Sequence, residues 1–284
     1  MTADHATTGG SLALERPLLL IGCGKMGGAM LEGWLARGLA ASLAVVVEPY
    51  ASPLTDGFKT RGVTVVDTLD ALPAGLDPAA VVLAVKPQKM EEVLAAAPRL
   101  VGPRCLVLSI AAGKRIGLFE AAFGAGVPVI RAMPNTPAAV GRGMTVLVAG
   151  RHAGAAERDL ATHLCAAVGA VGWVEDEGLI DVVTALSGGG PAYVFLLIEV
   201  LAKAGIAQGL APDLAMRLAR ETVSGSGELA RLSDEPADQL RRNVTSPAGT
   251  TERALAVLMA DDGLQPLFDR AIAAATARSR ELAG

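Results

Sequence analysis

The chain has 284 residues, of which 51% are hydrophobic but only 3% aromatic, and its formal net charge is −4. This length is typical of about two domains, and a core built from Ala, Val and Leu favours packed helices and sheets over an aromatic-layered β-sandwich. The negative charge, without any basic stretch, argues against nucleic acid as a partner. No uninterrupted apolar run is as long as a membrane span, so we expect no membrane association.

The N-terminal segment 1–15 is small and polar and lacks the charged and apolar regions of a secretory signal. We interpret it as a disordered extension and expect a cytoplasmic protein. Cys23, Cys105 and Cys165 are widely spaced and odd in number, a pattern of neither a disulfide framework nor a zinc site. With only three histidines, the sequence offers no plausible metal ligand set, so a cofactor and modest polar groups must carry any chemistry.

A short apolar strand runs directly into a glycine-rich turn and an amphipathic helix, at residues 18–21, 22–24 and 25–37. Gly22 permits the tight turn, and Gly24 has no Cβ to block close approach of a pyrophosphate. Gly27 lets the helix pack against the strand, so that the N–H groups of the first helical turn face the phosphates. The pattern therefore predicts a dinucleotide site that contains Gly22, Gly24, Lys25, Met26 and Gly27.

Strand and helix patterns alternate through the first 175 residues. We predict strands at 18–21, 44–47, 63–66, 81–85, 106–109, 127–131, 145–148 and 171–174, and helices at 25–37, 90–97, 116–123 and 153–168. Apolar strands alternating with helices indicate a mostly parallel sheet covered on both faces. We therefore predict an α/β fold class, with a Rossmann-like doubly wound domain over residues 16–175.

Glu48 ends the second predicted strand, about 20 residues beyond the glycine turn. An acidic group at this position can accept hydrogen bonds from a ribose diol and would repel a 2′-phosphate, which favours NAD(H) over NADP(H). The alternative is a solvated residue at a strand end. The cofactor is thus NADP(H) or NAD(H), and Glu48 leaves the preference open.

Short loops at three later strand ends complete the predicted cofactor crevice, because the carboxyl ends of parallel strands meet at one edge of the sheet. Lys86 can approach the phosphates or a ribose, and small side chains after the fifth strand leave room for a flat ring. Two prolines stiffen the loop after the sixth strand, which carries Asn135 and Thr136 towards the same edge. The cofactor-binding residues predicted from these loops are Ala84, Val85, Lys86, Pro87, Ile110, Ala111 and Ala112.

The β pattern disappears after residue 175, and residues 176–284 indicate an all-α domain. Helices are predicted at 181–186, 192–205, 212–232, 237–244, 251–260 and 264–282, with a Ser-Gly-Gly-Gly-Pro string at 187–191 that breaks one helix and starts another. Segment 192–204 is apolar on nearly all sides, as expected for a helix at the centre of a larger bundle than these helices provide. We infer a subunit interface, and hence a dimerisation domain; the alternative is burial within one chain.

The string Ser-Pro-Ala-Gly-Thr-Thr at 246–251 lies at the start of a predicted helix. It brings hydroxyls and unpaired backbone N–H groups to one point, which suits a small carboxylate. The alternative is that Thr250 and Ser246 only cap the helix. Four hydroxyls within seven residues, beside a glycine, exceed what a cap requires.

With these motifs, the chain resembles the pyrroline-5-carboxylate reductases from about residue 17 to 282. The motifs that carry the resemblance are Gly-Cys-Gly-Lys-Met-Gly (22–27), Ala-Val-Lys-Pro-Gln (84–88), Ser-Ile-Ala-Ala-Gly (109–113), Arg-Ala-Met-Pro-Asn-Thr-Pro (131–137), Ser-Gly-Gly-Gly-Pro-Ala-Tyr-Val-Phe (187–195) and Val-Thr-Ser-Pro-Ala-Gly-Thr-Thr (244–251). The resemblance implies reduction of the cyclic imine 1-pyrroline-5-carboxylate to L-proline with NAD(P)H, the last step of proline biosynthesis. It also implies an intertwined homodimer, often assembled into a decamer.

The resemblance further implies a substrate site between the nicotinamide and the Ser-Pro-x-Gly-Thr-Thr loop of a dimer partner. By position, the carboxylate would be held by Ser246, Gly249, Thr250 and Thr251. Thr251 would also hydrogen-bond the ring nitrogen, which makes Thr251 and Ser246 the expected catalytic residues, and Asn243 would support the site. Three positions depart from the common family pattern: Glu48 is acidic, Ala248 replaces a glycine and Gly189 replaces a serine.

Two other functions are compatible with this architecture. A ketopantoate or 3-hydroxyacid-type reductase usually places a catalytic lysine in the helical domain, but Lys203 is the only lysine after residue 175 and lies on the apolar helix. An NAD(H)-binding regulatory protein would not need a loop rich in hydroxyls. Both alternatives are therefore less favoured.

Overall fold

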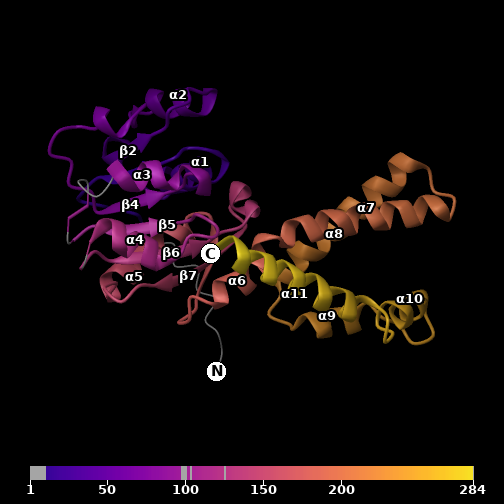
Figure 1. Ribbon diagram of the computed structural model, residues 1–284. Coiled ribbons are helices and arrows are strands. Elements are labelled where there is room, and N and C mark those ends of the chain that lie inside the picture. The colour runs from indigo at the N-terminus through magenta and orange to yellow at the C-terminus, as the bar shows by residue number, and fades with distance from the viewer. Residues whose placement is uncertain (1–10, 97–100, 103, 125, 284) are drawn as a thin grey trace. The chain divides into compact units, whose positions relative to one another are not determined.

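The computed structural model describes residues 11–96, 101–102, 104–124 and 126–283 (Figure 1). It divides into two compact units: a first unit of residues 1–188 and 276–284, and a second unit of residues 189–275. The predicted domain boundary at residue 175 therefore lies inside the first unit. The C-terminal end of the chain also belongs to the first unit, which the sequence did not indicate.

The first unit is built on one eight-stranded sheet in the order β3-β2-β1-β4-β5-β6-β7-β8. Its strands are β1 Leu18–Ile21, β2 Ala44–Val47, β3 Thr64–Val66, β4 Ala80–Leu83, β5 Leu106–Ser109, β6 Val129–Met133, β7 Gly143–Ala149 and β8 Gly169–Trp173. All neighbouring strands are parallel except β6 and β7. The predicted mostly parallel, doubly wound sheet is confirmed.

Helices cover both faces of this sheet. They are α1 Lys25–Ala36, α2 Pro53–Thr60, α3 Met90–Ala96, α4 Ile116–Phe123, α5 Ala155–Ala166 and α6 Leu179–Val183, with short 3₁₀ turns at Ala41–Leu43, Leu69–Ala71, Pro87–Lys89 and Thr136–Val140. Helix α2 was not predicted from the sequence. A capping box between Ser52 and Thr55 starts this helix, with Pro53 in its first turn.

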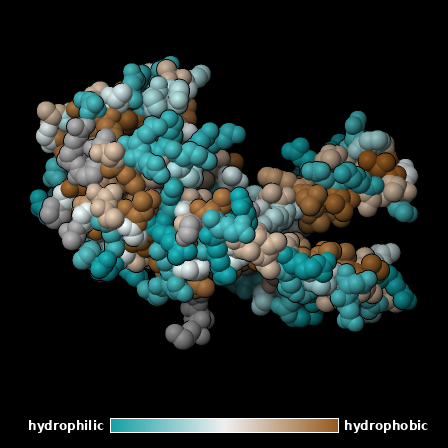
Figure 2. All heavy atoms as spheres, viewed as in Figure 1, coloured by the Kyte–Doolittle hydropathy of each residue, from teal (hydrophilic) through white to brown (hydrophobic). Residues whose placement is uncertain are grey.

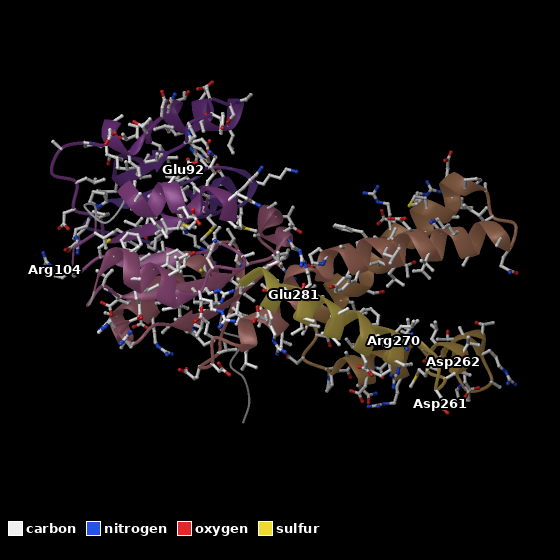
Figure 3. All side chains as sticks on the ribbon, viewed as in Figure 1. Glu92, Arg104, Asp261, Asp262, Arg270 and Glu281 are labelled. Carbon is white, nitrogen blue, oxygen red and sulfur yellow. The ribbon has the colours of Figure 1, made fainter. Side chains whose placement is uncertain are left out.

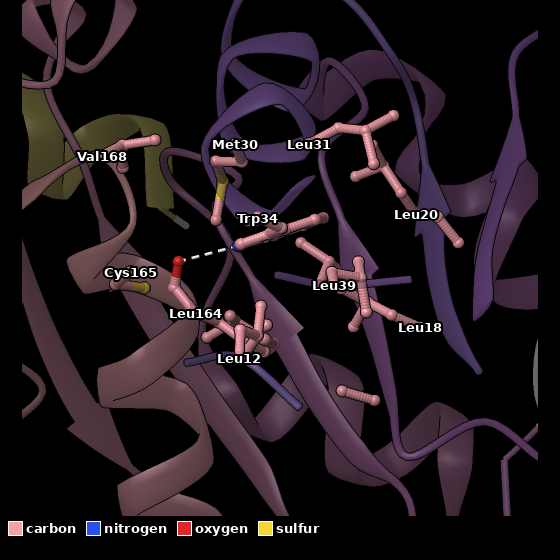
Figure 4. Packing of buried hydrophobic residues seen from close by; sticks show 14 of the residues in the cluster. Leu12, Leu18, Leu20, Met30, Leu31, Trp34, Leu39, Leu164, Cys165 and Val168 are labelled. Atoms are coloured by element: carbon pink, nitrogen blue, oxygen red, sulfur yellow. Dashed lines mark hydrogen bonds between the residues drawn. The ribbon is translucent and has the colours of Figure 1, made fainter. Parts of the chain in front are cut away.

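Alternate residues of each strand face opposite helical layers, as the two-residue period of a strand requires. Leu18 and Leu20 pack with α1, α2 and α5 in one buried cluster, whereas Leu19 and Ile21 pack with α3 and α4 in another. In the first cluster the indole N–H of the fully buried Trp34 donates to the carbonyl oxygen of Leu164 at 2.8 Å, which joins α1 to α5 (Figure 4). Two cores of this kind hold the sheet rigid and fix the position of its edge.

Residues 1–10 of the predicted disordered extension lie outside the described residues. Residues 11–15 are described, and Leu12 is buried in the cluster around α1. The backbone N–H of Leu12 donates to the carbonyl oxygen of Arg37 at 2.8 Å. The ordered chain thus begins before residue 16, because an apolar side chain in the predicted extension packs against the core.

The second unit is helical, as predicted. Its helices are α7 Gly190–Ala207, α8 Pro212–Leu232, α9 Ala237–Asn243, α10 Thr250–Leu258 and the greater part of α11 Leu264–Ala283. A π-helical turn at Thr184–Gly188 joins α6 to α7, so the predicted break at 187–191 is a π turn within one helical segment, residues 179–207. By length and composition alone, this segment is long and apolar enough to cross a membrane.

The second unit has almost no core of its own. Its buried residues are three alanines, Ala202, Ala215 and Ala219. Large apolar side chains instead remain exposed on α7 and α8, where Figure 2 shows a hydrophobic surface formed by Val194, Phe195, Leu196, Leu197, Val200, Leu201, Leu214 and Leu218. Charged residues also lie on this unit, among them Asp261 and Asp262 at the α10–α11 turn and Arg270 on α11 (Figure 3).

Candidate functional site

The strand ends at the carboxyl edge of the sheet bring the predicted cofactor loops together. The N–H of Ala84 donates to the carbonyl of Ile21 at 2.8 Å, and the N–H of Ile110 donates to that of Leu83 at 3.1 Å. The N–H of Gly22 donates to the last carbonyl of β2 at 2.9 Å. The loops after β1, β4 and β5 thus start side by side, at the point where the strand order reverses and ligands of doubly wound sheets bind.

The three glycines of the turn after β1 have different roles. Gly22 has a φ of +95°, and a Cβ there would lie 2.8 Å from the carbonyl oxygen of Ala84. A Cβ on Gly27 would collide with the carbonyl oxygen of Gly22. A Cβ on Gly24 would meet no atom within 4 Å. Gly22 and Gly27 are therefore required by the fold, whereas Gly24 borders open space at the N-terminus of α1, as a pyrophosphate site requires.

Both carboxylate oxygens of Glu48 accept backbone hydrogen bonds. Oε2 accepts from the N–H of Cys23 at 2.7 Å, and Oε1 accepts from the N–H of Tyr50 at 3.1 Å. Glu48 thus links the glycine turn to the loop after β2. Burial, and secondarily the Glu48 charge, raise the pKa of the Cys23 thiol to about 11. Cys23 therefore stays protonated at neutral pH and is no nucleophile.

The other predicted cofactor residues lie along the same edge. Lys25 and Lys86 are exposed, and the 3₁₀ turn that begins at Pro87 turns the chain after β4. After β5, Ala111 is buried and its N–H donates to Ser109 Oγ at 3.3 Å, while Ala112 is exposed. Small side chains therefore follow β5 at this edge; their place in a cofactor site stays a prediction.

Asn135 does not present a free amide to the crevice. Its Oδ1 accepts from the N–H of Met144 at 2.9 Å, and its Nδ2 donates to the Oγ of Ser187 at 3.2 Å and to the Ser187 carbonyl oxygen at 3.3 Å. The prediction that this loop carries Asn135 to the carboxyl edge of the sheet stays a prediction, but both ends of its amide are already hydrogen-bonded. The residue instead ties the loop after β6 to β7 and to the π turn.

The sequence did not indicate an ion pair near the same loops, between a buried guanidinium and a partly exposed carboxylate. The guanidinium of Arg131, 2% exposed, places Nη1 3.0 Å from Oε1 of Glu177. The same oxygen accepts the N–H of Ile116, the first residue of α4, at 2.8 Å. Arg131 Nη2 is buried and has no hydrogen-bond partner within the described residues. Glu177 thus supports β6 and the end of the β5–α4 loop together.

The loop before α10 leaves its hydroxyls available. The N-cap of α10 is Gly249, without a side-chain capping bond, so the alternative that Thr250 or Ser246 caps the helix is wrong. The hydroxyls of Ser246, Thr250 and Thr251 make no hydrogen bond to any other described residue. Asn243, by contrast, accepts from Gln239 and donates to Glu235 at 2.7 and 2.8 Å.

The same loop contains a strained residue. Ala248 has a φ of +57°, and it is the one non-glycine residue with positive φ in the described chain. This conformation costs an L-residue about 1–2 kcal/mol relative to the right-handed region. The N–H of Ala248 donates to Oε2 of Glu252 at 2.9 Å, which supports the turn and explains why a glycine would suit this position.

The remaining candidates for other chemistry are inert. Burial raises the pKa of the Cys105 and Cys165 thiols to about 12. Within the described residues, no group of three or more His, Cys, Asp and Glu side chains is placed to hold a metal ion. The first unit therefore offers backbone N–H groups, two exposed lysines and one carboxylate, and the second unit separately offers the hydroxyls of the loop before α10.

Two family models match the chain. One describes pyrroline-5-carboxylate reductase dimerisation and matches residues 177–282, and the other describes NADP oxidoreductase, coenzyme F420-dependent, and matches residues 18–113. A pyrroline-5-carboxylate reductase from Pseudomonas aeruginosa is 39% identical over 267 residues, which cover 94% of this chain and 96% of that protein.

Solved structures show the same similarity. A pyrroline-5-carboxylate reductase from Coxiella burnetii superposes with a TM-score of 0.88 at 35% identity, covering 95% of this chain and 99% of that one. The Plasmodium falciparum pyrroline carboxylate reductase, solved with NADP bound, gives a TM-score of 0.78 at 28% identity, covering 95% and 99%.

Proposed function

The chain belongs to the pyrroline-5-carboxylate reductase family, and from this membership we propose that it reduces 1-pyrroline-5-carboxylate to L-proline with a nicotinamide dinucleotide, as the last step of proline biosynthesis. Within the structure, the observation that carries the proposal is the loop before α10, whose hydroxyls are free of any capping role. A loop of this kind suits a small anionic substrate, and the glycine turn of the first unit suits the dinucleotide.

The glycine turn would hold the pyrophosphate of the dinucleotide. The space beside Gly24 admits the phosphates to the N–H groups that open α1. Lys25 and Lys86 add positive charge, and the loop of Ile110, Ala111 and Ala112 borders the flat nicotinamide ring. When bound, the reduced nicotinamide supplies a hydride to the substrate.

The loop before α10 would bind the imine. The N–H groups at the start of α10 attract the carboxylate through the positive end of the helix dipole, and the hydroxyls of Ser246 and Thr250 donate to its oxygens. Gly249 leaves the backbone accessible. We propose that the hydroxyl of Thr251 hydrogen-bonds the ring nitrogen, while the hydrogen bonds of Asn243 to Gln239 and Glu235 support the loop.

This residue set is sufficient for imine reduction. Protonation of the ring nitrogen makes the C=N carbon electron-poor, the hydride adds to that carbon, and the π electrons become the lone pair of the proline nitrogen. The protein therefore has to align the two reactants and stabilise charge rather than supply a strong acid. A ketopantoate-type mechanism would need a catalytic lysine in the helical domain, where Lys203 is the only lysine. Its side chain is 76% exposed, and its Nζ lies 3.9 Å from Oε2 of Glu199 on the same helix.

A direct assay tests the proposed function. The purified protein, given 1-pyrroline-5-carboxylate, is expected to oxidise NADH or NADPH, followed by the loss of absorbance of the reduced nicotinamide, and to form an equal amount of proline. A protein that binds dinucleotide but forms no proline with either one would contradict the proposal and favour a regulatory function. Turnover of ketopantoate or a 3-keto acid in place of the imine would favour the related reductases.

Thr251→Ala is expected to lower kcat/KM for the imine roughly a hundredfold, the loss typical of one donor to a developing charge. The KM for the dinucleotide should change little, because Thr251 lies in the second unit and the glycine turn in the first. Thr251→Ser keeps the hydroxyl and serves as the matched control, with activity near that of the unaltered protein. Steady-state kinetics with each substrate varied in turn make the comparison; an unchanged rate in Thr251→Ala would exclude the proposed role.

Self-association follows from the dimerisation model over residues 177–282 and accounts for the apolar helix 179–207. We propose a homodimer in which a second copy covers the exposed apolar surface of α7 and α8, since three buried alanines cannot stabilise the second unit alone. Sedimentation should give at least twice the chain mass of 28.8 kDa; a stable monomer would contradict this. The decamer and the cytoplasmic location stay predictions.

A further inference from the structure

The carboxylate of Glu48 is fixed at the edge where the dinucleotide is proposed to bind. Its two oxygens accept from the N–H groups of Cys23 and Tyr50 at 2.7 and 3.1 Å, and its own N–H donates to the carbonyl of Val66 at 2.9 Å. The side chain is therefore held from both sides and cannot turn away from the glycine turn without breaking these bonds. A solvated residue at a strand end, the alternative from sequence, would show no such contacts.

Glu48 retains the capacity to bind a ligand. An ionised carboxylate offers about four acceptor sites, and the two backbone N–H groups use two of them. The remaining two match the two hydroxyl donors of an unphosphorylated adenosine ribose. In doubly wound folds this diol is placed at the end of the second strand, where Glu48 lies.

The chain that follows β2 offers little positive charge to a 2′-phosphate. No lysine or arginine occurs in residues 48–58, after β2. The next two cations along the chain are each paired with a carboxylate, Lys59 with Asp56 at 3.8 Å and Arg61 with Glu32 at 2.6 Å. Lys89, which ends the 3₁₀ turn after β4, pairs with Glu92 at 2.9 Å. A 2′-phosphate carries more than one negative charge at pH 7. The fixed carboxylate of Glu48 would therefore repel it.

We propose that Glu48 makes this chain select NADH over NADPH, by accepting the ribose hydroxyls and repelling the 2′-phosphate. The inference rests on the proposed function, since it takes the dinucleotide to bind at this edge. A family member solved with NADP bound shows that the phosphorylated cofactor is compatible with the fold. The preference is therefore a property of individual residues at this position.

The test compares kcat/KM for NADH and NADPH in the unaltered protein, in Glu48→Gln and in Glu48→Ser. Asp261→Asn, at the exposed α10–α11 turn, is the control for loss of one negative charge. The unaltered protein and the control should favour NADH about tenfold or more, and both Glu48 variants should lose most of this preference through a gain with NADPH. Dissociation constants of both dinucleotides, measured without imine, should shift in the same way.

A preference for NADPH in the unaltered protein would overturn the inference. So would Glu48 variants that weaken both dinucleotides equally, because that result would reduce Glu48 to a support for the turn. Either outcome would leave proline formation intact, so the proposed function would survive. Absence of proline formation with both dinucleotides would instead overturn the proposed function itself. In Glu48→Gln the amide NH₂ would face one of the two backbone N–H groups that now donate to Glu48. If that variant fails to fold, Glu48→Ser provides the comparison.

Discussion

Gly24→Ala is expected to fold normally and to lose most of its affinity for dinucleotide. The backbone of Gly24 has φ −72° and ψ −160°, which alanine adopts without strain, and no atom lies within 4 Å of the added methyl group. The cost to folding should stay near 1 kcal/mol or less, since the change concerns only a helix N-cap. The new methyl group instead occupies the space beside the N-terminus of α1, and the dissociation constant should rise by about a hundredfold or more.

Gly27→Ala provides the contrast. Its methyl group would collide with the carbonyl oxygen of Gly22, so the turn must move, with a loss of about 3 kcal/mol or more in the free energy of unfolding. Thermal unfolding and dinucleotide binding, measured on both variants, separate a ligand-facing glycine from a structural one. If Gly24→Ala bound dinucleotide as tightly as the unaltered protein, the pyrophosphate could not lie at this turn.

The regular part of the fold follows from local patterns. The strands β1, β2 and β5 have their predicted bounds because each is a short run of buried residues: four apolar residues in β1 and β2, and three followed by the buried Ser109 in β5. Helix α2 was missed although its signal is present: Ser52 precedes Pro53 and a threonine at the third helical position. Its apolar face consists of little more than Leu54 and Phe58, and two turns are too few for a helical period to be recognised in the sequence.

The candidate site was predictable where one loop carries the chemistry and not where distant residues meet. The glycine turn and the hydroxyl-rich loop each lie within ten residues, so their geometry follows from local sequence. Glu177 and Arg131 are 46 residues apart, and Ser279 and Asp181, which form a buried hydrogen bond of 2.7 Å, are 98 apart. Such pairs depend on how α6 and α11 pack, which no periodicity in the sequence expresses.

The Arg131–Glu177 pair leads to the second large expected effect. Glu177→Ala removes the counter-charge of a guanidinium that is 2% exposed and whose Nη2 already lacks a partner within the described chain. It also removes the acceptor for the N–H of Ile116. Breaking a buried pair from one side typically costs about 3–5 kcal/mol, which corresponds to a fall of roughly 10 °C in the melting temperature of a chain this size.

Glu120→Ala is the control in which the cation is exposed: Glu120, itself 16% exposed, pairs at 2.9 Å with Arg151, which is 72% exposed. Loss of Glu120 leaves Arg151 hydrated, and a pair with an exposed cation contributes about 1 kcal/mol or less, so this variant should unfold almost as the unaltered protein does. The double variant Arg131→Met, Glu177→Gln should recover much of the loss, since it removes the buried charge along with its partner. Equal destabilisation by Glu120→Ala and Glu177→Ala would mean that the burial of Arg131 does not determine the cost. Recovery in the double variant would show that the cost lies in an unpaired buried cation, and that the pair supports the β5–α4 loop without itself being a source of net stability.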